Sequence, residues 1–506
     1  VTGVQTCALP ISGQLVLAAS GSIALDASLN AAGGERTVVN AANLSSIERG
    51  AAAQVDIAAQ NIQIVGGDVA ALDGFVQLST DDLNGIGAAS LLIGGTRSQS
   101  SVGTVIDTVA SRVVLSNTAD TALSGSELIL VASGTAPAMG EEPEAAVEIA
   151  DGSVIATTDV AFTGSDRALI LNGDGALLRL SNGNSVAVQR SGNSSNGGSG
   201  SLRIGSLASL GGGSSIGTGV LGAQSLTLDT SRSLSVQPDA QFAARFVDAN
   251  GSAIRFVADG VDTAGLDGLV LGSATLAQFA ASESLSLISR DDIRFIGDVS
   301  LALGDTALSL SAARFVGDGG AVSIDASRLS LGGTATATTA TVPTDALGSL
   351  DLNVGELLFG DGIARFDGFQ TVSASIDDRA IATGSSQFDF GAAAVTLSTP
   401  LLTANTDGDL RLTTSGALRL DTAAATAASV DGSIGGNIDL QAASIAIDTR
   451  ISARAGSLEV ATTAGDLSLG SNAALNVGGV AKQFFDVTQY ASAGRIALDA
   501  TGGSIV

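Results

Sequence analysis

Short runs of alternating apolar and polar residues recur along the whole chain, and they constrain its fold more than any other feature. Examples are SIALD (22–26), SLTLD (225–229), DLRLTT (409–414) and RIALD (495–499). Successive side chains of a strand point to opposite faces, so this period of two places the apolar residues on one face. The sequence therefore predicts an all-β chain whose strands are buried on one side. No stretch carries the amphipathic stripe of a helix, so no helix is predicted.

The spacing of these runs predicts how the strands pair. Between positions 437 and 469 the strands begin about 6 to 9 residues apart, so three of them form a repeat of about 20 residues, the length of a solenoid coil. Antiparallel hairpins would favour Asp-Gly at every second turn. Asp-Gly does occur, for example at 73–74, 151–152 and 431–432, but not in that order. We therefore expect short strands stacked in parallel, which are stable only collectively, as an elongated parallel β-helix.

The composition limits both the core and the partners. Hydrophobic residues are 45% of the chain, which excludes a disordered chain, but aromatic residues are only 3%. The net charge of −27 argues against nucleic acid and against anionic membrane surfaces. We interpret this charge as a source of solubility; the alternative is that outward rows of Asp collect divalent cations.

The opening of the chain differs from everything after it. Residues 1–11, VTGVQTCALPI, contain the only cysteine, Cys7, and resemble a translated sequencing adapter. On that interpretation the protein has no cysteine, so disulfides, thiol catalysis and thiolate metal sites are excluded. The sequence contains no run of 18 apolar residues, so no membrane-spanning helix is predicted. No signal peptide is visible. We expect either that the chain is cytosolic or that its true N-terminus lies upstream of Ser12. In the second case the sequence is a fragment that lacks caps.

Several stretches interrupt the strand pattern. The stretch 134–146 is an acidic, Pro-containing loop, 191–201 is a Gly/Ser turn or linker, and 334–343 is rich in Thr and Ala. The stretch 482–490, KQFFDVTQY, holds the only lysine and the only tyrosine, and we expect it to cap or plug a coil; the alternative is a ligand patch. The predicted organisation is thus an adapter-derived segment (1–11), a β-helix (12–190), the Gly/Ser segment (191–201) and a continuing β-helix (202–506) with an insert at 482–490.

Most catalytic motifs are rejected. The absence of histidine rules out Ser-His-Asp and Cys-His sites. The stretch 213–217 has the spacing of a nucleophile elbow and 217–222 that of a dinucleotide fingerprint, but the first lacks a base and the second lacks a following helix. The stretch 197–202 begins like a calcium β-roll repeat but has Ser where Asp belongs.

A polysaccharide-cleaving β-helix enzyme is the main alternative. Three pairs of adjacent carboxylates could serve as acid and base: Asp81–Asp82, Asp291–Asp292 and Asp377–Asp378. Adjacent strand residues point to opposite faces, so each pair must lie in a turn to cooperate. Asp291–Asp292 is the best candidate because Arg290 and Arg294 flank it and a lyase can use an arginine base with bound calcium.

The C-terminal part carries a family resemblance. The stretch 435–479, with GGNIDLQAASIAIDTR and AGDLSLGSNAALNVGG, and the stretch 482–506 resemble the repeats of the filamentous haemagglutinin family of bacterial surface proteins. About 70 residues match well. The resemblance implies a right-handed parallel β-helix, two-partner secretion through an outer-membrane transporter that recognises the parent protein, and a role in adhesion to surface glycans or receptors.

Together these observations predict a non-catalytic stalk of a large secreted adhesin at the bacterial cell surface. We expect no catalytic, cofactor-binding or metal-ligating residue in it. Its uncapped ends are expected to associate end to end.

Overall fold

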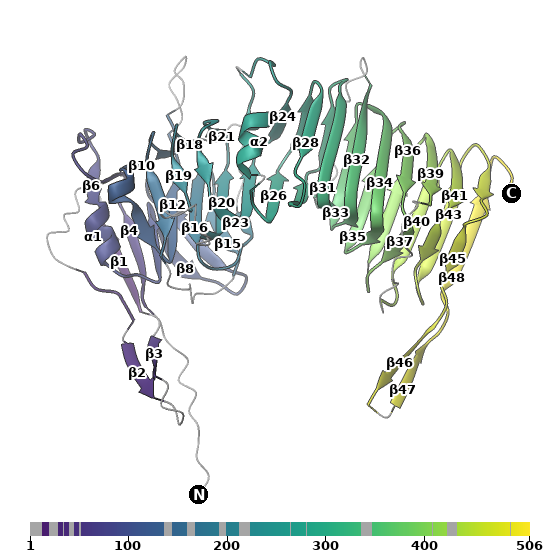
Figure 1. Cartoon of the computed structure of the whole chain (residues 1–506), viewed down its shortest axis with the longest axis horizontal. Helices are drawn as coiled ribbons and strands as arrows, with labels where there is room; N and C mark the ends of the chain where they lie inside the picture. Colours follow the sequence, from purple (N-terminus) through teal and green to yellow (C-terminus); the bar gives the residue numbers. More distant parts are fainter. Residues whose placement is uncertain are drawn as a thin grey trace, which may run out of the picture. The chain divides into compact units, whose positions relative to one another are not determined.

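The computed structural model divides the chain into two compact units, Val1–Gly251 (unit 1) and Ser252–Val506 (unit 2). Both are built almost entirely from β-strands (Figure 1). The structure describes residues 13–19, 29–33, 35–39, 45–49, 52–135, 144–158, 167–191, 199–211, 223–263, 265–279, 281–334, 347–406, 408–422, 433–485 and 487–506. Residues 1–11, the motifs at 213–217 and 217–222, and most of the predicted loops at 134–146, 191–201 and 334–343 lie outside this part of the chain.

Unit 2 is a stack of coils with two parallel sheets. One sheet, here called the Arg sheet, takes one strand from most coils, and its neighbouring strands pair in parallel. Its strands are β24 (Ile254–Val257), β25 (Gly268–Leu271), β27 (Asp292–Ile296), β30 (Arg314–Gly317), β33 (Gly362–Asp367), β35 (Ser385–Asp389), β38 (Asp409–Thr413), β40 (Asn437–Ala442), β43 (Ser457–Thr462) and β48 (Arg495–Ala500).

The other sheet of unit 2, the long-strand sheet, takes two strands or one long strand from each coil. Residues 322–325 of β31 pair with β28 and residues 328–332 pair with β29, so one long strand continues two shorter ones. Its strands are β26 (Ser284–Ser289), β28 (Val299–Ala302), β29 (Ala307–Ser311), β31 (Ala321–Gly332), β32 (Gly348–Phe359), β34 (Phe369–Ala382), β36 (Ala394–Ser398), β37 (Leu401–Ala404), β39 (Ala417–Asp421), β41 (Ser444–Asp448), β42 (Arg450–Ser452), β44 (Leu467–Leu469) and β45 (Ala474–Asn476).

The coil length agrees with the predicted repeat. Asn437 pairs with Ser457, which lies 20 positions further on, and Ser300 pairs with Ser323, 23 positions further on. Longer coils occur where a loop is inserted, as between Asp325 and Asn353, 28 positions apart. The prediction of an all-β fold made of stacked parallel strands, a parallel β-helix, is confirmed.

The interior of unit 2 contains a ladder of aromatic rings, although the composition suggested a core of small side chains. Phe256 stacks on Phe295 with ring centroids 5.2 Å apart, and Phe366 stacks on both Phe315 and Phe390 at 4.8 and 4.7 Å. All five rings are buried. Offset aromatic stacking contributes about 0.5–1.5 kcal/mol per pair beyond burial. A small number of aromatic residues therefore contributes to the stability of several coils.

Unit 1 has a parallel sheet comparable to the Arg sheet. In this side sheet the neighbouring strands pair in parallel. Its strands are β5 (Asn61–Val65), β6 (Val76–Ser79), β10 (Arg112–Ser116), β13 (Val147–Ile149), β18 (Leu202–Ile204) and β21 (Ser233–Val236). A third, short sheet is also parallel and contains β11 (Leu123–Gly125), β14 (Val154–Thr157), β19 (Ser209–Leu210) and β22 (Gln241–Phe242).

The main sheet of unit 1 departs from the predicted parallel order. Strand β16 runs antiparallel to both of its neighbours, β12 and β20. Strand β16 follows β15 of another sheet after the short connection 173–175, where Gly173 has a φ of 77°. The strands of this sheet are β1 (Gln14–Ala18), β4 (Gln54–Ala58), β7 (Ser90–Ile93), β12 (Glu127–Ala132), β16 (Ala176–Ser181), β20 (Ala223–Thr230) and β23 (Ala244–Gly251).

A fourth sheet, the overlying sheet, forms a second hydrophobic core in unit 1. Strands β12 and β16 are buried at every position, as expected for strands covered on both faces. The second core combines residues of the main and overlying sheets: Leu92, Ile106, Ile129, Val131, Leu169, Leu171, Leu177 and Val186. The overlying sheet contains β8 (Gly95–Gln99), β9 (Thr104–Thr108), β15 (Leu169–Asn172) and β17 (Val188–Ser191).

The expectation that no helix forms is wrong. Helix α1 (Thr80–Gly85) and helix α2 (Ser273–Phe279) are each about two turns or shorter, and Ala119–Thr121 forms a 3₁₀ turn. Six or seven residues are too few to show an amphipathic period in a sequence. In the described part of the chain, none of the helices has the length and hydropathy needed to cross a bilayer.

The stretch 482–490 does not plug a coil. It forms most of an antiparallel hairpin of β46 (Val480–Phe484) and β47 (Val487–Ala491), drawn apart from the stacked strands in Figure 1. Phe485 at its turn is fully exposed, and Tyr490 is 79% exposed. A second antiparallel hairpin, β2 (Glu35–Val39) with β3 (Ser45–Arg49), occurs in unit 1.

Candidate functional site

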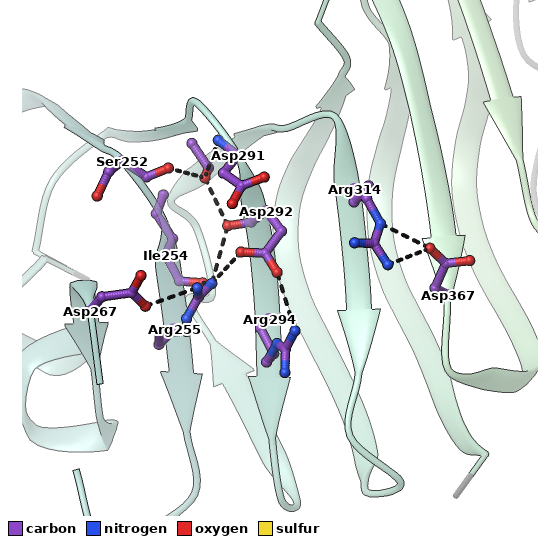
Figure 2. A network of polar contacts seen from close by, with 10 residues as sticks. Ser252, Ile254, Arg255, Asp267, Asp291, Asp292, Arg294, Arg314 and Asp367 are labelled. Carbon is purple, nitrogen blue, oxygen red and sulfur yellow. Dashed lines mark hydrogen bonds and ion pairs between the residues drawn. The ribbon is translucent and has the colours of Figure 1, made fainter. Parts of the chain in front are cut away.

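The strongest cluster of charged side chains in unit 2 lies on four neighbouring strands of the Arg sheet, β24, β27, β30 and β33 (Figure 2). In β27, Ile293 and Phe295 point into the buried core, so Asp292 and Arg294 occupy the opposite face. The same alternation places Arg314 of β30 beside Asp292 in the strand register. The local cause of the site is therefore the period of two in these strands.

Asp292 is the centre of one ion-pair group. Arg255 Nη1 donates to Asp292 Oδ1, and Arg255 Nη2 lies 3.0 Å from Asp267 Oδ1. Arg294 Nη2 lies 3.5 Å from Asp292 Oδ2. The carboxylate of Asp292 is thus shared between two guanidinium groups, as Figure 2 shows.

Asp367 is the centre of a second group one coil further on. Arg314 donates from Nε and Nη2 to Asp367 Oδ2 at 3.1 and 3.0 Å. Arg365 donates from Nε to Asp367 Oδ1 at 2.7 Å. Arg314 and Asp367 are almost completely buried. A buried charge is tolerated when it is paired and hydrogen-bonded, so this group satisfies the local electrostatics.

Asp291 differs from its neighbour because no ion pair joins its carboxylate to any residue of the described chain. Its backbone N–H donates to Ser252 O at 2.9 Å. Partial burial raises the pKa of Asp291, and the adjacent charge of Asp292 raises it further, while Arg255 and Arg314 act in the opposite direction. An acid with a raised pKa beside arginines is the feature that a lyase would need.

The arrangement nevertheless does not provide a free arginine to act as the base of a lyase. Arg255, Arg294 and Arg314 each form an ion pair with a carboxylate, so their guanidinium groups are engaged within the fold. Each carboxylate oxygen of Asp292 contacts an arginine, Oδ1 contacting Arg255 and Oδ2 contacting Arg294. Within the ranges that the structure describes, no group of three or more His, Cys, Asp and Glu side chains is placed to hold a metal.

The other two predicted carboxylate pairs lie elsewhere. Asp81 and Asp82 occupy the first turn of α1, where Ser79 Oγ accepts a hydrogen bond from Asp81 N at 3.1 Å. Acidic residues are stabilised at such a helix N-terminus. Asp377 and Asp378 are both exposed in β34, at an irregularity of its pairing with β32. A structural role explains each pair.

Arg255, Asp267, Arg314, Arg365 and Asp367 were missed by the sequence analysis. A recurring dipeptide points to the arginines, because Arg-Phe occurs at 255–256, 294–295, 314–315 and 365–366, although it also occurs outside the cluster at 245–246, where the Phe is only half-buried. In each of the four copies in the cluster the Phe is buried in the coil and the Arg occupies the outer face. Asp267 carries no comparable signal, since its partner Arg255 is 12 positions away. Asp367 lies two positions from Arg365, but its other partner, Arg314, is 53 positions away.

Comparison with known proteins adds no relative. No family model matches the chain, no curated protein is similar to it, and no solved structure matches it.

Proposed function

We propose that this chain is a non-catalytic structural segment of a large secreted adhesin at the bacterial cell surface, similar in kind to the filamentous haemagglutinins. Its role is mechanical: it holds other parts of the parent protein at a distance from the cell. The parent is exported by a two-partner-secretion transporter in the outer membrane and binds surface glycans or receptors.

The stacked order of unit 2 is the observation that supports this proposal. From β24 to β48 each strand of the Arg sheet hydrogen-bonds to the strands of the adjacent coils. Side chains continue the pairing on the outside, for example Arg379 Nε with Glu356 Oε1 at 2.7 Å. Each coil thus depends on its neighbours, a property that suits a load-bearing element.

The best candidate for catalysis supports the same proposal. Its arginines and Asp292 are paired with one another, so the charges that a lyase would direct at a sugar acid are used within the fold. The alternative, a carbohydrate-active β-helix enzyme, rests on the unpaired Asp291 alone.

Incubation with uronate polymers separates the two functions. The purified chain is mixed with pectate and alginate, with and without calcium, and new unsaturated ends are followed by ultraviolet absorbance. We expect no release above a heat-denatured control. Turnover by the unchanged chain that is lost in both Asp291→Asn and Arg294→Gln would contradict the structural role and support the enzyme.

Surface display tests the positive part of the proposal. Antibodies against this chain should label intact cells that carry the parent gene, and brief protease treatment of those cells should remove the label. Deletion of the cognate transporter should abolish surface labelling. Labelling that appears only after the cells are lysed would contradict a surface location.

A further inference from the structure

A small, partly enclosed cavity of about 20 Å³ lies in unit 1 between the main sheet and the overlying sheet. Ile106, Ile129, Leu169 and Val186 form its apolar wall, and all four belong to the second hydrophobic core. Its polar lining consists of Gln54, Arg97, Thr104, Glu127, Arg167 and Arg179. Arg97 and Arg179 are buried, whereas Arg167, which also lines the cavity, is an exposed residue.

Arg97 is fully paired. Its Nε lies 2.6 Å from Asp56 Oδ1, and its Nη1 donates to Ser90 Oγ at 2.6 Å. Its Nη2 donates to the carbonyl oxygens of Val55 and Ser90. The charge of Arg97 is therefore balanced by Asp56, which is itself completely buried.

Arg179 is paired at only part of its guanidinium. Its Nε donates to Glu127 Oε1 at 2.7 Å and its Nη1 donates to Ser225 Oγ at 2.9 Å. Its Nη2 is buried and has no hydrogen-bond partner in the structure, although only 1% of the side chain is exposed. Leaving a buried charged donor without an acceptor is unfavourable, so this atom calls for a partner that the described protein does not supply.

Arg167 is the surplus cation. Its Nη1 donates to Ser100 O at 3.1 Å, a neutral acceptor, and no carboxylate of the described residues pairs with it. Among the described residues, Asp56 balances Arg97 and Glu127 balances Arg179, whereas the exposed Arg167 adds one positive charge at the cavity. A single monovalent anion would neutralise the cavity.

We propose that this cavity is a binding site for one halide-sized anion, chloride in most solutions, held by Arg167 and by the unpaired Nη2 of Arg179. A water molecule needs about 10–15 Å³ of such space, so the cavity accommodates one occupant of that size and excludes sulfate and phosphate. Charge-assisted donors in an apolar layer bind an anion more strongly than water. The site lies apart from the Arg sheet and goes beyond the proposed mechanical function.

Bromide provides the direct test because it scatters anomalously and resembles chloride in size. Crystals of the chain grown in sodium bromide should show an anomalous peak in the cavity, beside Arg167 and Arg179. A cavity that contains only water, with no bromide peak, would overturn the proposal. The peak should be lost or strongly reduced in crystals of Arg167→Gln; undiminished bromide in that variant would show that the surplus charge does not hold the anion.

A solution measurement checks the same site in the folded protein. Chloride should raise the thermal midpoint more than gluconate does at equal ionic strength, because binding to the native state stabilises it. We expect Arg167→Gln to weaken the apparent chloride affinity about tenfold, whereas Arg411→Gln, at a half-exposed arginine of unit 2, should leave it unchanged. Equal responses to chloride and gluconate in the unchanged protein, or equal affinities in the two variants, would contradict the inference.

Discussion

Phe315 and Phe366 occupy the same register position of two adjacent coils, and their rings stack with centroids 4.8 Å apart and planes at 13°. Each is preceded by an arginine, Arg314 or Arg365, and both arginines donate to Asp367. Phe315 and Arg314 thus join the two coils twice, once by ring stacking with Phe366 and once by the ion pair of Arg314 with Asp367. This repeated arrangement is the basis of the predictions for unit 2.

Removing a ring from the aromatic ladder should destabilise unit 2. We expect Phe366→Ala to lower the free energy of unfolding by about 3–5 kcal/mol, because a large buried side chain is lost and a cavity is left between Phe315 and Phe390. Urea unfolding followed by circular dichroism measures the change. Phe485→Ala is the matched control, since Phe485 is fully exposed and should change stability by less than about 0.5 kcal/mol.

Removing the shared carboxylate should cost far more than removing an exposed one. Asp367→Ala leaves Arg314 buried without a counter-ion, and we expect a loss of about 3–5 kcal/mol. Asp421→Ala removes the partner of Arg419, whose side chain is 61% exposed, and should cost only about 0–1 kcal/mol. Urea midpoints that fall equally in the two variants would mean that burial does not decide the strength of these pairs.

The pH dependence of stability should reveal Asp291. Its pKa in the folded protein is raised by burial and by Asp292, so its ionisation opposes folding. The contribution of this residue is therefore most favourable below the unfolded pKa of 3.8 and is lost as the pH rises through the folded value. We expect Asp291→Asn to stabilise unit 2 at neutral pH and to have little effect in strong acid.

Asp448 gives the opposite sign and serves as the control. Hydrogen bonds from the backbone and side chain of Asn472 lower the pKa of Asp448. Its stabilising contribution is present above the unfolded pKa and is lost as the pH falls through the folded value. Asp448→Asn should therefore destabilise the protein at neutral pH. Thermal melts between pH 3 and 7 measure both variants. If Asp291→Asn and Asp448→Asn shifted the melting temperature in the same direction at neutral pH, the opposite pKa directions given for Asp291 and Asp448 would be contradicted.

A row of glycines at one corner of unit 2 should not tolerate side chains. A Cβ on Gly456 would lie 1.8 Å from Gly436 O, and a Cβ on Gly494 would lie 1.7 Å from Gly456 O. Gly456→Ala should therefore force the coils apart and cost about 1–3 kcal/mol, measured by urea unfolding. Gly85→Ala is the control because nothing lies within 4 Å of its added Cβ, and it should be neutral or slightly stabilising.

Part of the charged cluster could be recognised from the sequence alone. Asp291, Asp292 and Arg294 were singled out because they are adjacent in the sequence. Arg255, the other partner of Asp292, was not singled out, since it lies 37 positions away. The pair of Arg314 with Asp367 was not either, since its two residues are 53 positions apart. In a solenoid the distance along the chain between neighbours depends on every loop in the intervening coil, and a single sequence does not specify which residues those loops bring into register.

A period of two and short, regular spacing are enough to predict strands buried on one side, coils of about 20 residues and parallel stacking. The reversal of β16, the second core under the overlying sheet and the projecting hairpin at 480–491 became visible only in the folded chain. These features depend on the direction in which the chain leaves one sheet and enters another. That direction is set by packing between residues that are distant in the sequence, and the alternation of residues within a strand does not specify it.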